Sequence, residues 1–332
     1  MAKSENQKLK ILYLLEMLWE ETDEEHPLST KRIIEKLEKK DVKAERKSIY
    51  ADIEALQDFG FDIILKSGRS DGGYYLASRD FELAELKLLV DAVLASRFIT
   101  ENKSRKLIEK LERLTSKHQG GEIKSHLALQ GRAKTENEKI YYSIDAIYKA
   151  INENKKLSFT YLEWALSSKK LEPRKKREKY IISPWSMVWD DDNYYLIGYD
   201  SAAGKIKHYR VDKIKDAEPL SEKRDGRSLL EDINLAEYTK KTFGMYGGTE
   251  KMVSLRLPDY LFGVMMDRFG KDIAVRKLPD GYLVVRIKAV ISRQFFGWLC
   301  GLGKDVTIQA PDDIKAEYTA WLNEILKAQK EG

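Results

Sequence analysis

Residues 183–214 decide the fold of the middle of the chain, and their sequence is SPWSMVWDDDNYYLIGYDSAAGKIKHYRVDKI. Apolar and alternating runs within it are interrupted at residues 190–193 and 201–204 by clusters of Asp, Asn, Ser and Gly. This pattern predicts three short antiparallel strands joined by tight turns. Aromatic and cationic side chains converge near one end of these strands, which suits the binding of an anionic ligand.

The same pattern extends to the residues before this stretch. Strands are predicted at residues 157–161, 180–183, 187–189, 194–199 and 206–211. A segment with a strict apolar stripe, residues 140–151, precedes them and predicts a helix. Five short antiparallel strands after one helix predict a small, strongly bent barrel. The cation-rich segment 169–179 is predicted to be a solvated loop, with an electrostatic funnel for a polyanion as the alternative.

The N-terminal region has the helix order of a DNA reader. Apolar residues at helical spacing predict a first helix through residue 18, a second that Ser29 or Thr30 caps, and a third over about residues 44–59. On a helical wheel the third helix turns Arg46, Lys47 and Tyr50 away from its apolar stripe. This order predicts a helix-turn-helix whose third helix enters the major groove. The alternative is a small helical domain with a solvated face.

A β-hairpin is predicted directly after the third helix. Residues 61–65 and 74–76 alternate around the turn-forming run 67–73, as in the wing of a winged helix. The residues expected to contact DNA through bases or phosphates are Ser29, Lys31, Lys43, Arg46, Lys47, Ser48, Tyr50, Lys66 and Arg69. Residues 31–50 hold eight basic and four acidic side chains, so the attraction to phosphate is expected from a local patch.

Composition bounds the class of protein. The chain has 332 residues, 42% of them hydrophobic and 34% charged, and a net charge of +5, which fits a soluble protein with two or three cores. It has no apolar run of 18 residues and no signal-peptide core at its start, so we expect a cytoplasmic protein without a membrane contact. The one cysteine, Cys300, forms no disulfide within the chain.

The remaining segments predict an α+β, multidomain protein. Amphipathic helices are expected over residues 82–98 and around 107–114, and alternating strands at 251–257 and 281–287 accompany helices at 262–269 and 314–326. The predicted domains are a winged helix-turn-helix at 1–78, a helical connector at 79–137, the barrel at 138–220, a linker at 221–248 and a small α+β domain at 249–332.

The chain resembles the WYL-domain transcriptional regulators over nearly its whole length. Residues 194–196, Tyr-Tyr-Leu, stand where that family has its naming Trp-Tyr-Leu, so an aromatic ring is kept at the first position. The family's Arg-x-Phe-Arg-Leu-x-Arg-Ile run is similar to residues 207–214, with lysine in place of arginine at two positions. Lysine weakens bidentate recognition of phosphate there. Phe-Gly-Trp at residues 296–298 resembles the family's C-terminal extension.

The resemblance implies a DeoR-type winged N-terminal domain and an Sm-like or SH3-like barrel. In that family the barrel binds a nucleotide or a single-stranded nucleic-acid effector and changes how the winged domain engages DNA. Carried over to this chain, the effector-binding candidates are Tyr161, Ser183, Tyr195, Lys207, His208, Arg210 and Lys213. Cations would neutralise phosphate and tyrosines would stack on bases. For Tyr195 a place in the core is the alternative.

Nothing in the sequence indicates an enzyme. The four histidines share no metal-ligand spacing, the acidic run 190–192 is explained as a turn, and residues 301–304 lack the spacing of a phosphate-binding loop. No catalytic residue, metal or cofactor is expected. We expect a homodimeric, ligand-responsive transcriptional regulator that binds a double-stranded DNA operator. One alternative is an RNA- or single-stranded-DNA-binding accessory protein. Another is a nucleotide-metabolising enzyme, but no cluster of residues in the sequence supports catalysis.

Overall fold

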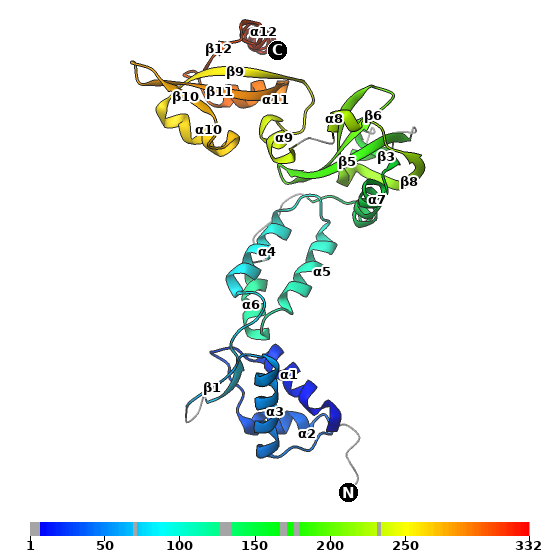
Figure 1. The fold of residues 1–332 in the computed structure, drawn as a ribbon, viewed down its shortest axis with the longest axis vertical. Coiled ribbons are helices and arrows are strands. Elements are labelled where there is room, and N and C mark those ends of the chain that lie inside the picture. Colours follow the sequence, from blue (N-terminus) through cyan, green and yellow to red (C-terminus); the bar gives the residue numbers. More distant parts are fainter. Residues whose placement is uncertain are drawn as a thin grey trace. The chain divides into compact units, whose positions relative to one another are not determined.

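Helices and antiparallel sheets make up the chain, so it is a mixed α and β protein. The computed structural model describes residues 7–68, 72–126, 134–166, 171–175, 179–230 and 234–331. The chain divides into two compact units, Met1–Glu138 and Lys139–Gly332, and Figure 1 labels their elements where there is room. None of the described helices is both long and apolar enough to cross a membrane.

Three helices and a hairpin open the first unit. Their bounds are Gln7–Leu9 for the 3-10 turn η1, Lys10–Glu21 for α1, Thr30–Glu38 for α2, Arg46–Phe59 for α3, Ile63–Lys66 for β1 and Gly73–Leu76 for β2. The helices are amphipathic, and residues from all three, such as Leu18, Ile33 and Ile49, share one core with the hairpin. Ser29 caps α2 by accepting a hydrogen bond from the Arg32 N–H, as the sequence predicts. β1 and β2 pair in antiparallel register.

Three more helices complete the first unit: α4 (Leu83–Ala95), α5 (Glu101–Glu112) and α6 (Lys117–His126). They bury one apolar cluster that includes Leu86, Val90 and Ile108. The sequence predicts α4 and α5 but not α6. The reason is the glycine pair at 120–121, which indicates the end of a helix in the sequence and lies inside α6 in the structure.

Side chains join α5 and α6 to the loop that follows α1. Asp23 accepts a hydrogen bond from the Ser116 hydroxyl at 2.6 Å and contacts the His26 ring at 2.7 Å. The rings of His26 and His118 stack with centroids 3.7 Å apart. The indole N–H of Trp19 donates to the Arg113 carbonyl. The three-helix segment is therefore held to the helices that follow it by polar contacts as well as by chain connectivity.

The second unit begins with helix α7 (Ile140–Asn152) and a six-stranded antiparallel sheet. The strands are β3 (Lys155–Leu166), β4 (Leu171–Lys175), β5 (Tyr180–Asp190), β6 (Asn193–Asp200), β7 (Lys205–Arg210) and β8 (Ile214–Lys223), with the 3-10 turn η3 (Val211–Lys213) before β8. Their order is β4-β3-β5-β6-β7, and β8 pairs with β3. α7 packs on β3, β5 and β8 through the face that carries Ile140 and Ile147.

The sheet differs from the sequence prediction in two ways. The predicted strands 180–183 and 187–189 are one strand, β5, whose register with β6 shifts between Pro184 and Ser186. Proline has no N–H for the ladder, and a bulge is the usual way to accommodate it. β4 and β8 were not predicted, because the first lies in the charged segment 169–179 and the second is mostly polar.

Residues 221–248, predicted as a linker, carry two short helices, α8 (Arg227–Leu230) and α9 (Leu235–Lys241). After α9 the chain makes a tight turn in which Gly244 and Met245 both have positive φ. Phe243 is buried against Phe295 and Trp298, with ring centroids 5.3 and 5.0 Å away. The aromatic contacts of Phe243 anchor this turn on the C-terminal part of the unit.

The C-terminal part is a four-stranded antiparallel sheet with helices. Its elements are β9 (Thr249–Pro258), η4 (Asp259–Leu261), α10 (Phe262–Phe269), β10 (Ala274–Lys277), β11 (Tyr282–Ile291), α11 (Arg293–Gly301), β12 (Thr307–Ala310) and α12 (Asp312–Glu331). The strand order is β10-β11-β9-β12. Helices α10, α11 and α12 contribute to one core with β9 and β11. The sequence predicts β9, β11, α10 and α12, but not α11 or the two short edge strands.

Candidate nucleic-acid interface and ligand pocket

The exposed face of α3 carries the side chains expected to meet DNA. Arg46 and Lys47 are exposed in its first turn, and Tyr50 is 46% exposed one turn later. The apolar residues Ile49, Ile53 and Leu56 occupy the opposite face and are buried. Helical periodicity thus separates a cationic, solvent-facing surface from the core side.

The remaining predicted contact residues are spread around this face. Lys31 and Lys43 are exposed, and Lys31 lies 3.9 Å from Glu35 on the same helix. Lys66 is exposed on β1 and donates a hydrogen bond to the Glu24 carbonyl at 2.7 Å. Arg69 lies outside the described residues.

Ser48 has a partner inside the protein. Its hydroxyl accepts a hydrogen bond from the ammonium group of Lys10, which also forms an ion pair with Asp52 at 2.8 Å. Lys10 is only 8% exposed. Ser48 therefore belongs to a buried polar link between α1 and α3, and the structure gives it a packing role that helical spacing alone does not indicate.

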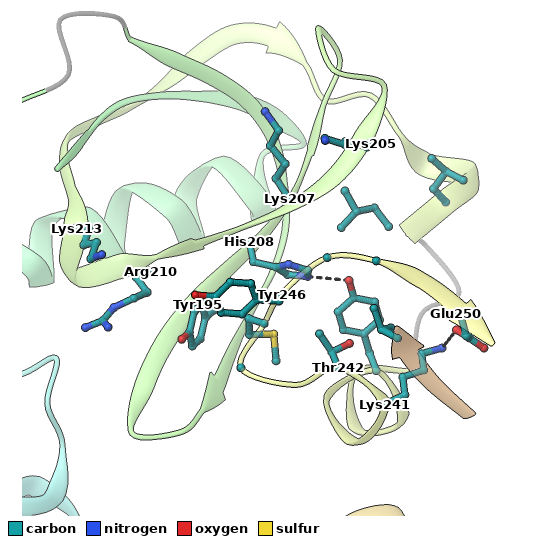
Figure 2. Close-up of a pocket in the computed structure, with 18 of the residues that line it drawn as sticks. Tyr195, Lys205, Lys207, His208, Arg210, Lys213, Lys241, Thr242, Tyr246 and Glu250 are labelled. Carbon is teal, nitrogen blue, oxygen red and sulfur yellow. Dashed lines mark hydrogen bonds and ion pairs between the residues drawn. The ribbon is translucent and has the colours of Figure 1, made fainter. Parts of the chain in front are cut away.

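A pocket of about 1060 Å³ in the second unit collects most of the predicted effector-binding residues. Six of the seven line it: Tyr161, Tyr195, Lys207, His208, Arg210 and Lys213. Figure 2 shows Lys205 and Lys207 toward one end of β7 and Arg210 and Lys213 toward the other, with Tyr195 and His208 between them. The seventh, Ser183, is fully buried away from the pocket and accepts a hydrogen bond from the Asp225 N–H at 2.7 Å.

The opposite wall of the pocket comes from residues 229–250, where the sequence predicts a linker. The lining residues that sequence reasoning missed are Lys205, Ile206, Leu229, Tyr238, Lys241, Thr242, Gly244, Met245, Tyr246, Gly247, Gly248, Glu250 and Val290. A signal for part of this wall was present in the run Gly-Met-Tyr-Gly-Gly at 244–248, because clustered glycines beside an aromatic residue allow a ligand to approach the backbone closely.

Carboxylates already hold three of the five cations that line the pocket. Lys207 pairs with Asp200 at 2.5 Å. The Arg210 guanidinium forms a bidentate pair with Asp212, at 3.1 Å from Nε and 2.9 Å from Nη2. The third pair joins Lys241 to Glu250 at 2.5 Å. Lys205 and Lys213 have no such partner among the described residues, so these two ammonium groups are the ones most open to an anion.

Tyrosine rings form the central part of the pocket. Tyr161 packs edge-on against Tyr209 with centroids 5.5 Å apart, and its hydroxyl accepts a hydrogen bond from the Arg210 N–H. Burial raises the pKa of Tyr161 to about 12, and burial also raises the pKa of Tyr195. Both tyrosines are therefore neutral near pH 7 and add no negative charge to the pocket.

His208 links the two walls. Its Nε2 lies 2.7 Å from the hydroxyl of Tyr238 on α9. Burial lowers the pKa of His208 to about 4, against the opposing effect of a backbone hydrogen bond with Met245. His208 is thus neutral near pH 7 and contributes a hydrogen bond to the pocket but no charge. Among the described residues no group of three His, Cys, Asp or Glu side chains could hold a metal ion.

Family models match both parts of the second unit. The model described as WYL domain matches residues 143–219, and the model described as WCX domain matches residues 253–326. The second unit therefore carries a WYL domain followed by a WCX domain, in agreement with the family that the sequence resembles. The pocket-lining residues between these two matches, including α9 and the 244–248 turn, belong to neither of them.

Solved structures give weak overall similarities. Proteasome accessory factor B/C (PafBC) of Arthrobacter aurescens is 19% identical, with a TM-score of 0.30 over 97% of this chain and 48% of that chain. This chain thus spans about half the length of PafBC. A structure described as a CRISPR Cas-related protein is 16% identical, with a TM-score of 0.36 over 75% of this chain and 73% of that chain. No curated protein matches the sequence.

Proposed function

We propose that the protein is a ligand-responsive, DNA-binding transcriptional regulator. In this proposal residues 1–78 form a winged helix-turn-helix whose α3 reads duplex DNA, and the sheet of the second unit is an Sm-like or SH3-like barrel that senses a phosphate-bearing effector. The WYL-domain and WCX-domain matches support the regulatory role. The protein is proposed to act as a cytoplasmic homodimer, because helix-turn-helix proteins commonly read paired half-sites, and to turn over no substrate.

One observation carries the effector part of the proposal. The pocket is lined by five cations and four tyrosines, with one carboxylate, Glu250, among its described lining residues. Cations neutralise phosphate oxygens, and tyrosine rings offer flat surfaces to bases. Three of the cations are already paired with carboxylates of the protein. The remaining positive charge of the pocket therefore comes from Lys205 and Lys213, which lie toward its two ends.

The first unit offers a physical route from the connector to the DNA-reading segment. The Asp23–Ser116 hydrogen bond and the His26–His118 stack hold the α1–α2 loop on the corner between α5 and α6. A displacement of α5 and α6 would therefore carry the three-helix segment with it. A coupling free energy of about 1–3 kcal/mol between effector and operator is typical of such systems.

Genome-wide mapping of bound DNA, followed by binding measurements on the duplexes recovered, tests the proposal. We expect a sequence preference that survives at physiological salt and changes when a phosphate-bearing effector is added. The competing candidate is an RNA- or single-stranded-DNA-binding accessory protein, which the tyrosines and cations of the pocket would equally serve. Binding of single strands without any duplex sequence preference would favour that candidate and contradict ours.

A further inference from the structure

The pocket has a feature at its α9 end that the proposed function does not use. Lys241, the last residue of α9, pairs with Glu250, the second residue of β9. The Lys241 side chain is 18% exposed and that of Glu250 is 42% exposed. Burial and the nearby charge of Glu250 together raise the pKa of Tyr238 to about 12. One negative charge of the protein itself thus sits inside an otherwise cationic pocket.

A buried donor without a partner lies directly beside this ion pair. Thr242 follows Lys241, lines the same pocket and is 1% exposed. Its hydroxyl has no hydrogen-bond partner among the described residues. An unpaired buried hydroxyl costs free energy, and an acceptor that binds beside Thr242 in the pocket would relieve that cost.

The glycine turn opposite leaves room for such an acceptor. A Cβ on Gly247 would meet no atom within 4 Å, so the wall is open there. A Cβ on Gly248 would lie 2.0 Å from the Ile291 carbonyl oxygen, so only glycine lets the turn pack this closely on β11. The turn therefore combines a closely packed backbone at Gly248 with open space at Gly247, and both residues line the pocket.

We propose that Lys241, Thr242 and the turn at Gly247 and Gly248 form a subsite for a terminal phosphate, and that Glu250 competes with that phosphate for Lys241. This inference rests on the proposed function, because it assigns one end of the proposed effector pocket. It adds the chemical class of the group bound there, a phosphomonoester, and a residue that selects for it.

The selection follows from charge. A phosphomonoester carries about −1.5 to −2 at pH 7, whereas each phosphate of a nucleic-acid backbone carries one negative charge. A group that takes Lys241 must displace the single charge of Glu250. A backbone phosphate replaces the single charge of Glu250 by another single charge, so its binding gains little free energy. A phosphomonoester brings additional charge and more acceptor oxygens for Lys241 and Thr242. Glu250 therefore acts as a filter against internal phosphates.

Occupancy of the subsite also has a mechanical consequence. The Lys241–Glu250 pair ties the end of α9 to the start of the C-terminal sheet. A phosphate that takes Lys241 releases Glu250 and with it this tie. The same event that recognises the ligand thus loosens the connection between α9 and β9.

Calorimetric titration of the full chain with inorganic pyrophosphate tests the subsite alone. Lys241→Met should weaken binding at least about tenfold, as expected for loss of a charge-assisted hydrogen bond, and Lys241→Arg should keep most of it. Glu250→Gln should strengthen binding, because it removes the competitor. Lys240→Met is the matched control, since Lys240 is a neighbouring exposed lysine that does not line this pocket. Equal affinities in all five proteins would overturn the inference.

A second titration separates this inference from the proposed function. The probes are a short oligothymidylate with a 5′-phosphate and the same oligonucleotide with a 5′-hydroxyl. We expect the phosphate to tighten binding to the wild-type protein, and Lys241→Met to abolish that difference. If both probes bind equally well and pyrophosphate does not bind, the proposed effector pocket is supported and the phosphate subsite is contradicted. If only pyrophosphate binds, in a Lys241-dependent manner, the subsite stands and the nucleic-acid effector falls. If nothing binds, both fall.

Discussion

The imidazole of His208 on β7 and the phenol of Tyr238 on α9 lie 2.7 Å apart, and this hydrogen bond joins the two walls of the pocket. Both groups are largely buried and neutral near pH 7, because burial lowers the pKa of His208 to about 4 and raises that of Tyr238 to about 12. The link is therefore sensitive to acid, which protonates His208.

Stability of the second unit should depend on pH through His208. Its pKa is about 4 in the fold and about 6.5 in an unfolded chain, so the unfolded state binds more protons between these values. The contribution of neutral His208 is complete above pH 6.5 and is lost as the pH falls toward 4, by about 3 kcal/mol. Hydrogen exchange of the β6 and β7 amides should show this loss in the wild-type protein and not in His208→Gln. Identical pH profiles would contradict the assignment.

Asp190 should make the second unit less stable as the pH rises, which is opposite to the effect of His208. Burial first, and the charge of Asp191 next, raise its pKa to about 6, and its Oδ2 has no hydrogen-bond partner among the described residues. The ionised carboxylate therefore opposes folding increasingly as the pH rises from about 4 past 6. Asp190→Asn should stabilise the second unit by about 1–2 kcal/mol at pH 8, after allowance for its partial exposure to solvent, and by nothing at pH 4. Asp259→Asn, at an exposed carboxylate, is the control and should show no such trend.

Duplex recognition should depend on the first turn of α3. Replacing Arg46 and Lys47 by alanine removes two exposed cations, and a good bidentate contact to a base contributes about 1–3 kcal/mol of discrimination. We expect sequence-specific binding to disappear in footprinting. The matched control replaces Lys106 and Lys110, exposed on α5, and should leave the footprint in place while losing the same charge. A retained footprint in the α3 variant would refute the assignment.

The Lys10–Asp52 pair should matter for stability and not for reading bases. Its side chains are 10% and 18% exposed, so Lys10→Met leaves a largely buried carboxylate without its partner. We expect the free energy of unfolding of the first unit to fall by about 3 kcal/mol. Ser48→Ala should cost about 1 kcal/mol and leave the base preference unchanged, because the hydroxyl is engaged by Lys10. An altered base preference in Ser48→Ala would show that the hydroxyl also faces DNA.

Lys213 should contribute more to ligand affinity than Arg210 does, although the sequence alone favours the arginine. Arg210 is held by Asp212, whereas Lys213 has no carboxylate partner among the described residues. Lys213→Met should weaken single-stranded DNA binding about tenfold and reduce the salt dependence by roughly one phosphate contact. Lys215→Met, on β8 and outside the pocket, removes the same charge and should have little effect. Equal losses in both variants would indicate a general charge effect.

The sequence predicts the elements whose periodicity is strong. Helices α1 to α5, α7, α10 and α12 follow from apolar spacing, and the alternation around residues 194–199 locates β6. The sequence does not predict β8, because this strand is mostly polar. Its place in the sheet comes from pairing with β3 and packing against α7. The bulge at Pro184 turns one strand into two apparent ones.

The candidate pocket was predicted only on one side. The resemblance predicts Lys207, His208, Arg210 and Lys213, and the structure places all four along one wall, on β7 and the turn after it. Tyr238 and Lys241 were missed because a seven-residue helix leaves too short a periodic pattern to separate from a polar linker. What brings them to the pocket is the insertion of Phe243 among the aromatic rings of the C-terminal core, a contact between distant segments.

The described residues 234–248 connect the sheet that α7 covers with the C-terminal sheet, and Phe243 inserts from this segment into the C-terminal core. Side chains such as Glu237 and Lys240 in this segment are exposed, so their replacement opens no void in a hydrophobic core. Under the proposed function, two proteins that share both flanking domains would respond to different ligands through changes in this connecting segment. Grafting it between relatives offers a direct way to transplant ligand preference.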